Sequence, residues 1–327
     1  MASSKQLLGM IRSHAIGDEA NFFAIAEHIA ADAAKAGRGR MANDIRTLVG
    51  NLQDEAARRR PASRPTPIFA PRGELASILH ASYPETKIDD LVLSAPLERR
   101  LRGILREHRE RDLLEDQGLE PRRKLLLAGP PGTGKTMTAA AIAAELGLPL
   151  FTVMLDGVIN KFMGETAAKL RLVFDAVSVT RGVYFFDEVD ALATSRGTEN
   201  DVGEARRTLN SLLQFLDQDK SASVLIAATN HAALLDPAIF RRFDASLAYE
   251  RPGTDEIRRI LEVHLSRFTI SGVDWTSISA DATGLSQADL VAAARDAARV
   301  AVLDHGGTIC NDLLRASISE RAQLHRN

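Results

Sequence analysis

The chain contains a single cysteine, Cys310, among its 327 residues. One thiol cannot form an intrachain disulfide, and a cysteine-rich zinc site is excluded as well. A lone thiol also favours a reducing, cytoplasmic setting. The sequence therefore predicts a fold that is held together without intrachain disulfides or a cysteine-rich zinc site.

Long apolar runs are missing too. No uninterrupted apolar stretch reaches the ~18 residues of a membrane span, and the first residues lack the apolar core of a signal peptide. Neither sign of charge is in large excess. The 41 Lys and Arg residues nearly balance the 43 Asp and Glu residues, which gives a formal net charge of −2. We expect no membrane span, and the balanced charge argues against a nucleic-acid partner.

The first 60 residues show a helical pattern. Apolar residues recur at helical spacing before and after a break at Gly37–Arg40, namely Phe22, Phe23, Ile25, Ala26, Ile29 and Ala30, then Ile45, Leu48, Val49 and Leu52. We expect residues 1–60 to form a small all-helical N-terminal domain that docks partners or recognises a substrate.

A run rich in proline and arginine follows, from Arg58 to Pro71. Such a composition is typical of an extended linker, which we assign to residues 61–87. The basic cluster would either contact phosphates or acidic lipids, or be solvated, and solvation is the commoner case.

A long globular block begins near residue 88. Short apolar runs at 124–128, 150–153, 183–186 and 223–228 alternate with helical stretches. This alternation is typical of an α/β fold whose parallel sheet is covered on both faces. We expect a doubly wound parallel sheet over 88–252 and a C-terminal helical lid over 253–327.

The first apolar run leads into Gly129-Pro-Pro-Gly-Thr-Gly-Lys-Thr136, which satisfies the P-loop pattern G-x-x-x-x-G-K-[ST]. Glycines let backbone N–H groups converge on phosphates, and the following helix adds the positive end of its dipole. Lys135 is expected to reach the β- and γ-phosphates and Thr136 to bind Mg²⁺. The alternative is an accidental Gly-rich turn, but a strand and a helix flank the motif. The predicted nucleotide-binding residues are Gly129, Pro130, Pro131, Gly132, Thr133, Gly134, Lys135, Thr136, Met137 and Asp187.

Polar residues end two further strands. Asp187 and Glu188 follow the run 183–186, and Asn230 follows Thr229. Carboxyl ends of parallel strands bind ligands, so we expect Asp187 to hold Mg²⁺ and Glu188 to polarise the attacking water. Asn230 would either orient that water or contact the γ-phosphate. The alternatives are a structural carboxylate pair that caps a helix and a simple turn asparagine.

Together these segments resemble the AAA family of ATPases. GPPGTGKT matches the family's Walker A segment, FFDEVDAL its Walker B segment, AATN its sensor-1 segment and LDPAIFRRFD its arginine-finger segment, in the same order. The resemblance covers roughly residues 88–325 and implies ATP, Mg²⁺ and a homo-oligomeric ring, usually of six subunits. The finger segment lacks an extra Pro-Gly, which brings it nearest to katanin-, spastin- and ESCRT-disassembly-type members.

The resemblance makes Arg241 and Arg242 arginine fingers. An arginine from a neighbouring subunit would stabilise the charge that spreads over the γ-phosphoryl oxygens. The alternative is a surface pair that balances Asp236 and Asp244.

The segment Asn160–Thr166, NKFMGET, matches the loop that faces the ring's pore in this family. By resemblance, Phe162 would grip an extended polypeptide, with Met163 as its apolar neighbour and Lys161 before it. The alternative is that Phe162 packs into a local core. Family position also suggests a second pore loop at 194–203.

By family position too, Arg196, Arg206 and Arg207 would relay signals between subunits. The lid departs from the family's Gly-Ala-Asp, since Ser286-Gln287-Ala288-Asp289 stands there. Ser286 and Asp289 predict a capping-box start to a helix, and a sensor-2 contact through Ala288 is left open.

The leading interpretation is a ring-forming ATPase that remodels, unfolds or disassembles a protein client by threading or pulling on it. Its partners would be a client and a separate protease or adaptor bound through the N-terminal domain. No His-Glu-x-x-His occurs, which excludes a fused zinc protease of the membrane AAA type. The alternatives are a nucleic-acid-loading ATPase and a nucleotide-gated scaffold, and a small-molecule kinase fits least because no second-substrate pocket is apparent.

Overall fold

A computed structural model describes residues 25–26, 29–30, 39, 43, 47, 71, 73–155, 165–192 and 199–324. The chain divides into two compact units, residues 1–66 and 67–327. In the first unit every described residue is helical, and Ala26, Ile29 and Ala30 are buried. Their burial follows the helical spacing of the apolar residues there.

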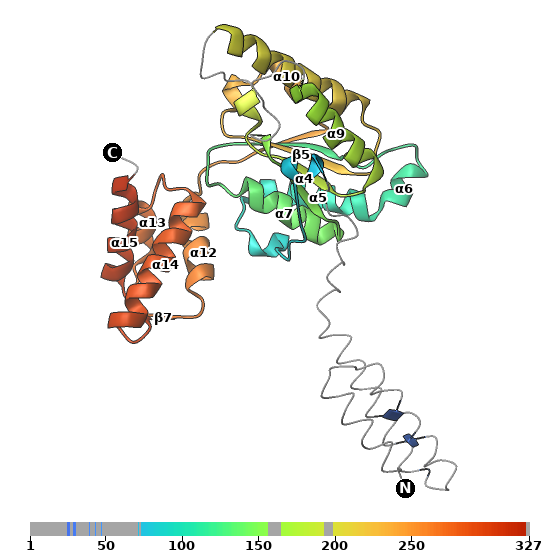
Figure 1. The fold of residues 1–327 in the computed structure, drawn as a ribbon. Coiled ribbons are helices and arrows are strands. Elements are labelled where there is room, and N and C mark those ends of the chain that lie inside the picture. Colours follow the sequence, from blue (N-terminus) through green and yellow to red (C-terminus); the bar gives the residue numbers. More distant parts are fainter. Residues whose placement is uncertain are drawn as a thin grey trace. The chain divides into compact units, whose positions relative to one another are not determined.

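The second unit alternates strands and helices along the chain (Figure 1). Its first half comprises α4 (Leu75–Ile78), β1 (Leu79–Ser82), η1 (Ile88–Asp90), α5 (Ala95–Arg109), α6 (Arg111–Glu115), β2 (Lys124–Ala128), α7 (Lys135–Leu146), β3 (Leu150–Val153), α9 (Glu165–Val179), β4 (Val183–Phe186) and η2 (Val189–Leu192). Its second half comprises α10 (Glu199–Gln218), β5 (Val224–Thr229), η3 (Ala232–Leu234), α11 (Pro237–Phe240), β6 (Ala245–Ala248), α12 (Thr254–Leu265), β7 (Thr269–Ile270), α13 (Trp275–Asp281), α14 (Gln287–Asp304), β8 (Thr308–Ile309) and α15 (Asn311–Leu324).

The main sheet has six strands in the order β1-β3-β4-β5-β2-β6. Its strands pair in parallel, except that β1 pairs antiparallel with β3 at one edge. The four strands expected from apolar runs are β2, β3, β4 and β5, whereas β1 and β6 were not expected. Because α4 and β1 lie within the segment 61–87, the folded unit begins earlier than the linker assignment predicted.

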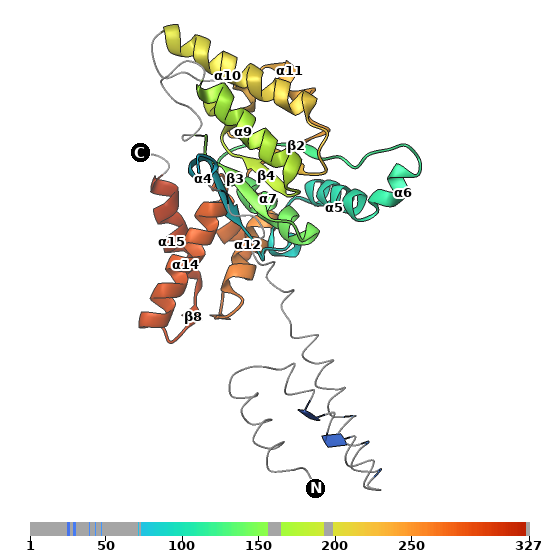
Figure 2. The same cartoon turned by 45° about the vertical axis from the view of Figure 1, so that its right-hand side comes forward.

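Helices cover both faces of this sheet (Figure 2). Residues alternate between the faces, so Leu126 of β2 packs in one apolar cluster while Leu125 and Leu127 pack in the other. The first cluster is shared with α9 and α10, and the second with α5 and α7. The doubly wound α/β fold expected from the sequence is therefore confirmed.

The lid comprises α12, α13, α14 and α15 around a core that includes Ile260, Leu290 and Leu314. It also contains a short parallel pair, β7 and β8, which an all-helical prediction did not include. Ser286 caps α14: its Oγ accepts a hydrogen bond from the Asp289 amide at 3.2 Å, and an Asp289 oxygen accepts one from the Ser286 amide at 3.0 Å. The predicted capping box is confirmed.

Among the described residues, none of the helices combines the length and apolarity that crossing a bilayer requires.

Candidate nucleotide site

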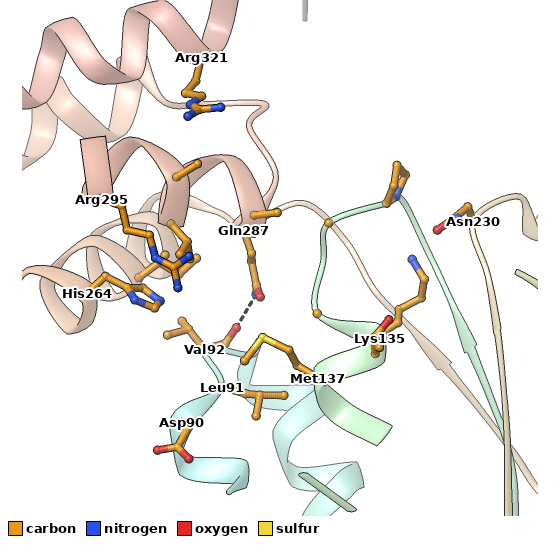
Figure 3. A pocket seen from close by; sticks show the side chains of 18 of the residues that line it. Asp90, Leu91, Val92, Lys135, Met137, Asn230, His264, Gln287, Arg295 and Arg321 are labelled. Carbon is orange, nitrogen blue, oxygen red and sulfur yellow. Dashed lines mark hydrogen bonds between the residues drawn. The ribbon is translucent and has the colours of Figure 1, made fainter. Parts of the chain in front are cut away.

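A cavity of about 620 Å³ lies between the carboxyl edge of the sheet and the lid. Its volume is in the range of small-molecule sites. Figure 3 shows Lys135 and Asn230 on one side of it and lid residues on the other. The cavity therefore joins residues from both parts of the second unit.

The P-loop forms one wall. The chain leaves β2 at Gly129 and enters α7 at Lys135, and the two intervening glycines Gly132 and Gly134 adopt φ values of 74° and 95°. This left-handed conformation suits glycine and curls the loop around the start of α7. Amides at a helix N-terminus attract phosphate, so the loop fits a triphosphate.

Lys135 is folded onto its own loop. Its Nζ donates hydrogen bonds to the carbonyls of Gly129 at 2.7 Å and Pro130 at 2.8 Å, and only 6% of the residue is exposed. Burial lowers the pKa of this amine, while the nearby Asp187, and more weakly other acids, raise it. The ammonium is thus held at the loop where phosphates would bind.

Gly129 also lies where a side chain would not fit. A Cβ at this position would overlap the carbonyl oxygen of Tyr249, the residue directly after β6. The Tyr249 amide donates to the Ala128 carbonyl at 2.7 Å, and its hydroxyl donates to Thr138 Oγ1 at 2.7 Å. Tyr249 therefore holds both the end of β2 and the first turn of α7.

Oxygen groups suited to Mg²⁺ lie beside the loop. Thr136 Oγ1 donates to Asp187 Oδ2 at 3.2 Å, which brings a hydroxyl and a carboxylate to one spot. Mg²⁺ prefers such hard oxygen ligands. Thr136 and Asp187, the two residues predicted to bind the metal, therefore fit the ion.

Glu188 follows directly and is the only described residue other than glycine with a positive φ, 51°. Its amide donates to Asp187 Oδ1 at 2.9 Å, and its side chain is exposed at the cavity. A left-handed non-glycine residue is strained, and such strain concentrates at functional sites. Asn230 lines the same cavity, and its backbone N–H donates to Asp190 Oδ1 at 3.1 Å.

The two candidate arginine fingers lie elsewhere. Neither Arg241 nor Arg242 lines the cavity. Arg241 is exposed, and Arg242 is half-buried, with its Nε 3.1 Å from Asp217 Oδ2. Asp244, suggested as a balancing acid, instead accepts hydrogen bonds from the backbone amides of Arg123 and Lys124.

Several wall residues carried no sequence signal. Leu91 and Val92 supply apolar surface beside Met137, which was predicted, and His264 and Arg295 project from the lid (Figure 3). Burial, with Arg295 nearby, lowers the pKa of His264. An apolar pocket with a few polar groups suits a nucleotide base, but Leu91, Val92, His264 and Arg295 belong to no contiguous motif.

Gln287 and Ala288 also line the cavity at the start of α14. Gln287 Nε2 donates to the Val92 carbonyl at 2.5 Å, and the Ala288 amide donates to the Gly132 carbonyl at 3.1 Å. The lid is therefore fastened both to the apolar wall and to the P-loop.

Other predicted residues lie outside the described part of the chain. These are Lys161, Phe162 and Met163 of the first pore-loop prediction, Arg196 of the second, and the side chains of Arg206 and Arg207. Their roles stay predictions.

Comparison with known proteins gives relatives along most of the chain. Residues 125–251 match the family described as "ATPase family associated with various cellular activities (AAA)". An AAA family ATPase of Sinorhizobium fredii is 36% identical over 307 residues, which cover 93% of this chain and 91% of the relative.

Two further relatives are longer proteins. The ATP-dependent zinc metalloprotease FtsH 3 of Sphaerobacter thermophilus is 34% identical over 76% of this chain and 51% of its own length. The proteasome-activating nucleotidase of Methanococcus maripaludis is 37% identical over 64% of this chain and 53% of its own length. The chain spans about half the length of each.

Proposed function

Because the chain belongs to the AAA family of ATPases, which hydrolyse ATP, we propose that it is a ring-forming machine that uses ATP to remodel, unfold or disassemble a protein client. The proposal rests mainly on one relationship. The cavity gathers Lys135, Glu188 and Asn230, yet Arg241 and Arg242 lie outside it.

Each of these cavity residues is assigned a role in ATP binding or hydrolysis. The P-loop amides and Lys135 would hold the triphosphate, and Thr136 and Asp187 would hold Mg²⁺, which would neutralise phosphate charge. Glu188 orients and deprotonates the attacking water, and Asn230 fixes that water's position.

The arginines complete the site from a neighbouring copy. An exposed Arg241 with Arg242 beside it would meet the γ-phosphate across a subunit boundary, where added positive charge stabilises the transition state. We therefore propose a homo-oligomer, a ring of six by family analogy, in which hydrolysis requires adjacent subunits.

The type of client, the family subtype and the roles of single segments are each supported by fewer observations. The relatives named FtsH and proteasome-activating nucleotidase support protein remodelling, and the short finger segment alone supports a katanin-like subtype. Client gripping by Phe162, docking of a protease or adaptor by residues 1–60 and a cytoplasmic setting complete the proposal.

A mixing experiment tests the shared site. Subunits carrying Arg241→Ala and Arg242→Ala bind ATP but lend no arginine, whereas Lys135→Ala subunits lend arginines but bind ATP poorly. Mixed assemblies should regain ATPase activity that neither variant has alone. If assemblies shown to contain both variants stay inactive at every ratio, the shared site is disproved.

Client handling is tested separately. Phe162→Ala should keep basal ATPase activity and lose client unfolding, with Glu188→Gln as the binding-competent trap that captures clients. Truncation of residues 1–66 in the Glu188→Gln background shows whether that unit selects them, because both forms retain the nucleotide site. Unchanged client processing by Phe162→Ala would reject the threading role.

A further inference from the structure

A second cavity borders the P-loop. Its volume is about 440 Å³, and its walls come from the start of α5, the segment that joins β6 to α12 and the first residue of α14. Thr133 lines this second cavity, whereas its neighbours Gly132 and Gly134 line the nucleotide cavity. The backbone of the P-loop therefore passes between the two cavities.

The segment before α5 divides in the same way. Val92 lines the nucleotide cavity and Leu93 lines the second cavity. Of all the residues that the structure describes, Gln287 alone lines both. Its side chain therefore lies where the two cavities adjoin.

The Gln287 side chain bridges the two backbone segments. Its Nε2 donates a hydrogen bond of 2.5 Å to the Val92 carbonyl (Figure 3). Its Oε1 lies against the P-loop, since a Cβ built at Gly134 would be 3.0 Å from this oxygen. The side chain thus extends from the P-loop to Val92 and separates the two cavities.

Backbone contacts on both sides of Gln287 hold it in this position. It is the first residue of α14, where the Ser286 amide donates to Asp289 Oδ2 at 3.0 Å. The Ala288 amide donates to the Gly132 carbonyl at 3.1 Å. Because the helix start is fixed to the P-loop, the Gln287 bridge is a defined wall of the nucleotide cavity.

The second cavity has the size and the surface to accept an apolar group. Leu93, Leu97 and Pro252 line it, together with charged residues such as Arg100 and Glu256. Its volume is in the range of small-molecule sites, so a phenyl-sized substituent fits. Gln287 is what separates such a substituent from the nucleotide.

We propose that Gln287 is a specificity-determining residue that limits the size of the base in the nucleotide cavity. The inference rests on the proposed function, because it requires ATP to bind here with its base at the apolar wall of Leu91 and Val92. A group added to the base would have to displace the Gln287 side chain. Displacement breaks the bond to Val92 and leaves a largely buried carbonyl without its partner, which costs free energy.

Gln287→Ala tests the proposal in the full-length protein, because it removes the bridge and joins the two cavities. The probes are ATP and three ATP analogues that carry a benzyl-sized group on N6, C2 or C8 of the base, one for each edge that a substituent can occupy. Calorimetric titration in a Glu188→Gln background, which slows hydrolysis, measures each Kd. For at least one analogue, the ratio of its Kd to that of ATP should fall at least about tenfold. Gln287→Ser, which also lacks the bridge, should behave alike.

The ratio of the two Kd values separates selectivity from a loosened lid, because a loosened lid weakens the binding of ATP and of its analogues alike. An unchanged ratio for all three analogues would overturn the proposal. Binding of every analogue as tightly as ATP when Gln287 is intact would do so too. Both results leave the proposed function standing, whereas a Glu188→Gln protein that binds no ATP would reject the nucleotide site and the inference with it.

A second substitution shows where the added group goes. Ser94 lines the second cavity, and its side chain forms no capping hydrogen bond with α5. In the Gln287→Ala background, Ser94→Phe should fill the second cavity and cancel the gain in analogue binding. Ala95→Phe is the matched control and should keep the gain, since Ala95 is exposed and lines neither cavity. If Ser94→Phe also keeps the gain while thermal unfolding shows all variants to be folded, the proposal is overturned.

Discussion

The backbone amide of Ala288 donates a hydrogen bond of 3.1 Å to the carbonyl of Gly132, so the lid helix α14 begins on the P-loop itself. A Cβ at Gly132 would lie 2.6 Å from Ser286 Oγ and 3.2 Å from Ala288 Cβ. The phosphate-binding loop and the lid therefore meet at a position that only glycine fits.

Gly132→Ala should weaken ATP binding by at least about tenfold, or 1.4 kcal/mol, because the methyl group displaces the lid. Gly118→Ala is a matched control: Gly118 has φ 73°, close to the 74° of Gly132, but nothing lies within 4 Å of an added Cβ. Titration with a fluorescent ATP analogue measures both. Equal binding by the two variants would show that lid contact at Gly132 is unimportant.

Because Glu188 has a positive φ, we expect glycine to be more stable than alanine at this position, the reverse of the usual order. Glu188→Gly should be more stable than Glu188→Ala by about 1 kcal/mol, since a Cβ is strained in this conformation. At Asp175, inside helix α9, Asp175→Ala should instead be more stable than Asp175→Gly by about 1 kcal/mol. Urea unfolding of the four variants tests this, and the same order at both sites would contradict the strain at Glu188.

The contact between Thr136 and Asp187 predicts a metal dependence. Chelation of Mg²⁺ with EDTA should abolish ATPase activity, and added Mg²⁺ should restore it. Asp187→Asn weakens a hard oxygen site and should raise the Mg²⁺ concentration for half-maximal activity several-fold. Asp175→Asn is the control, and an unshifted Mg²⁺ titration of Asp187→Asn would reject this residue as part of the metal site.

His108 predicts a loss of stability in mild acid. Its Nε2 donates to the Arg122 carbonyl at 2.7 Å, and burial is the main cause of its lowered pKa. As pH falls below about 6.5, the unfolded chain takes up a proton before the folded chain does, so the free energy of unfolding decreases. Below the pKa of His108 in the folded protein, both states are protonated, and this histidine causes no further decrease in the free energy of unfolding.

His108→Gln should therefore flatten the pH dependence of stability below pH ~6.5. Chemical unfolding at a series of pH values measures the slope. His305→Gln, at an exposed position after α14, controls for removal of a histidine as such. A slope unchanged by His108→Gln would mean that this group does not contribute.

Much of the fold was readable from local pattern. The strands β2, β3, β4 and β5 are continuous apolar runs because helices cover them on both faces, and continuous runs are easily recognised. The edge strands β1 and β6 are short, with sequences LHAS and ASLA, and each is only partly buried. Their pairing partners, not their composition, make them strands.

The amino-acid sequence alone located the P-loop and the pair Asp187 and Glu188, because each group is contiguous and directly follows a single strand, β2 or β4. The tertiary structure decided the rest. Val92 meets Gln287 across 195 positions, and Arg242 meets Asp217 across 25. No local pattern encodes such pairs, since the packing of whole helices on a sheet brings them together.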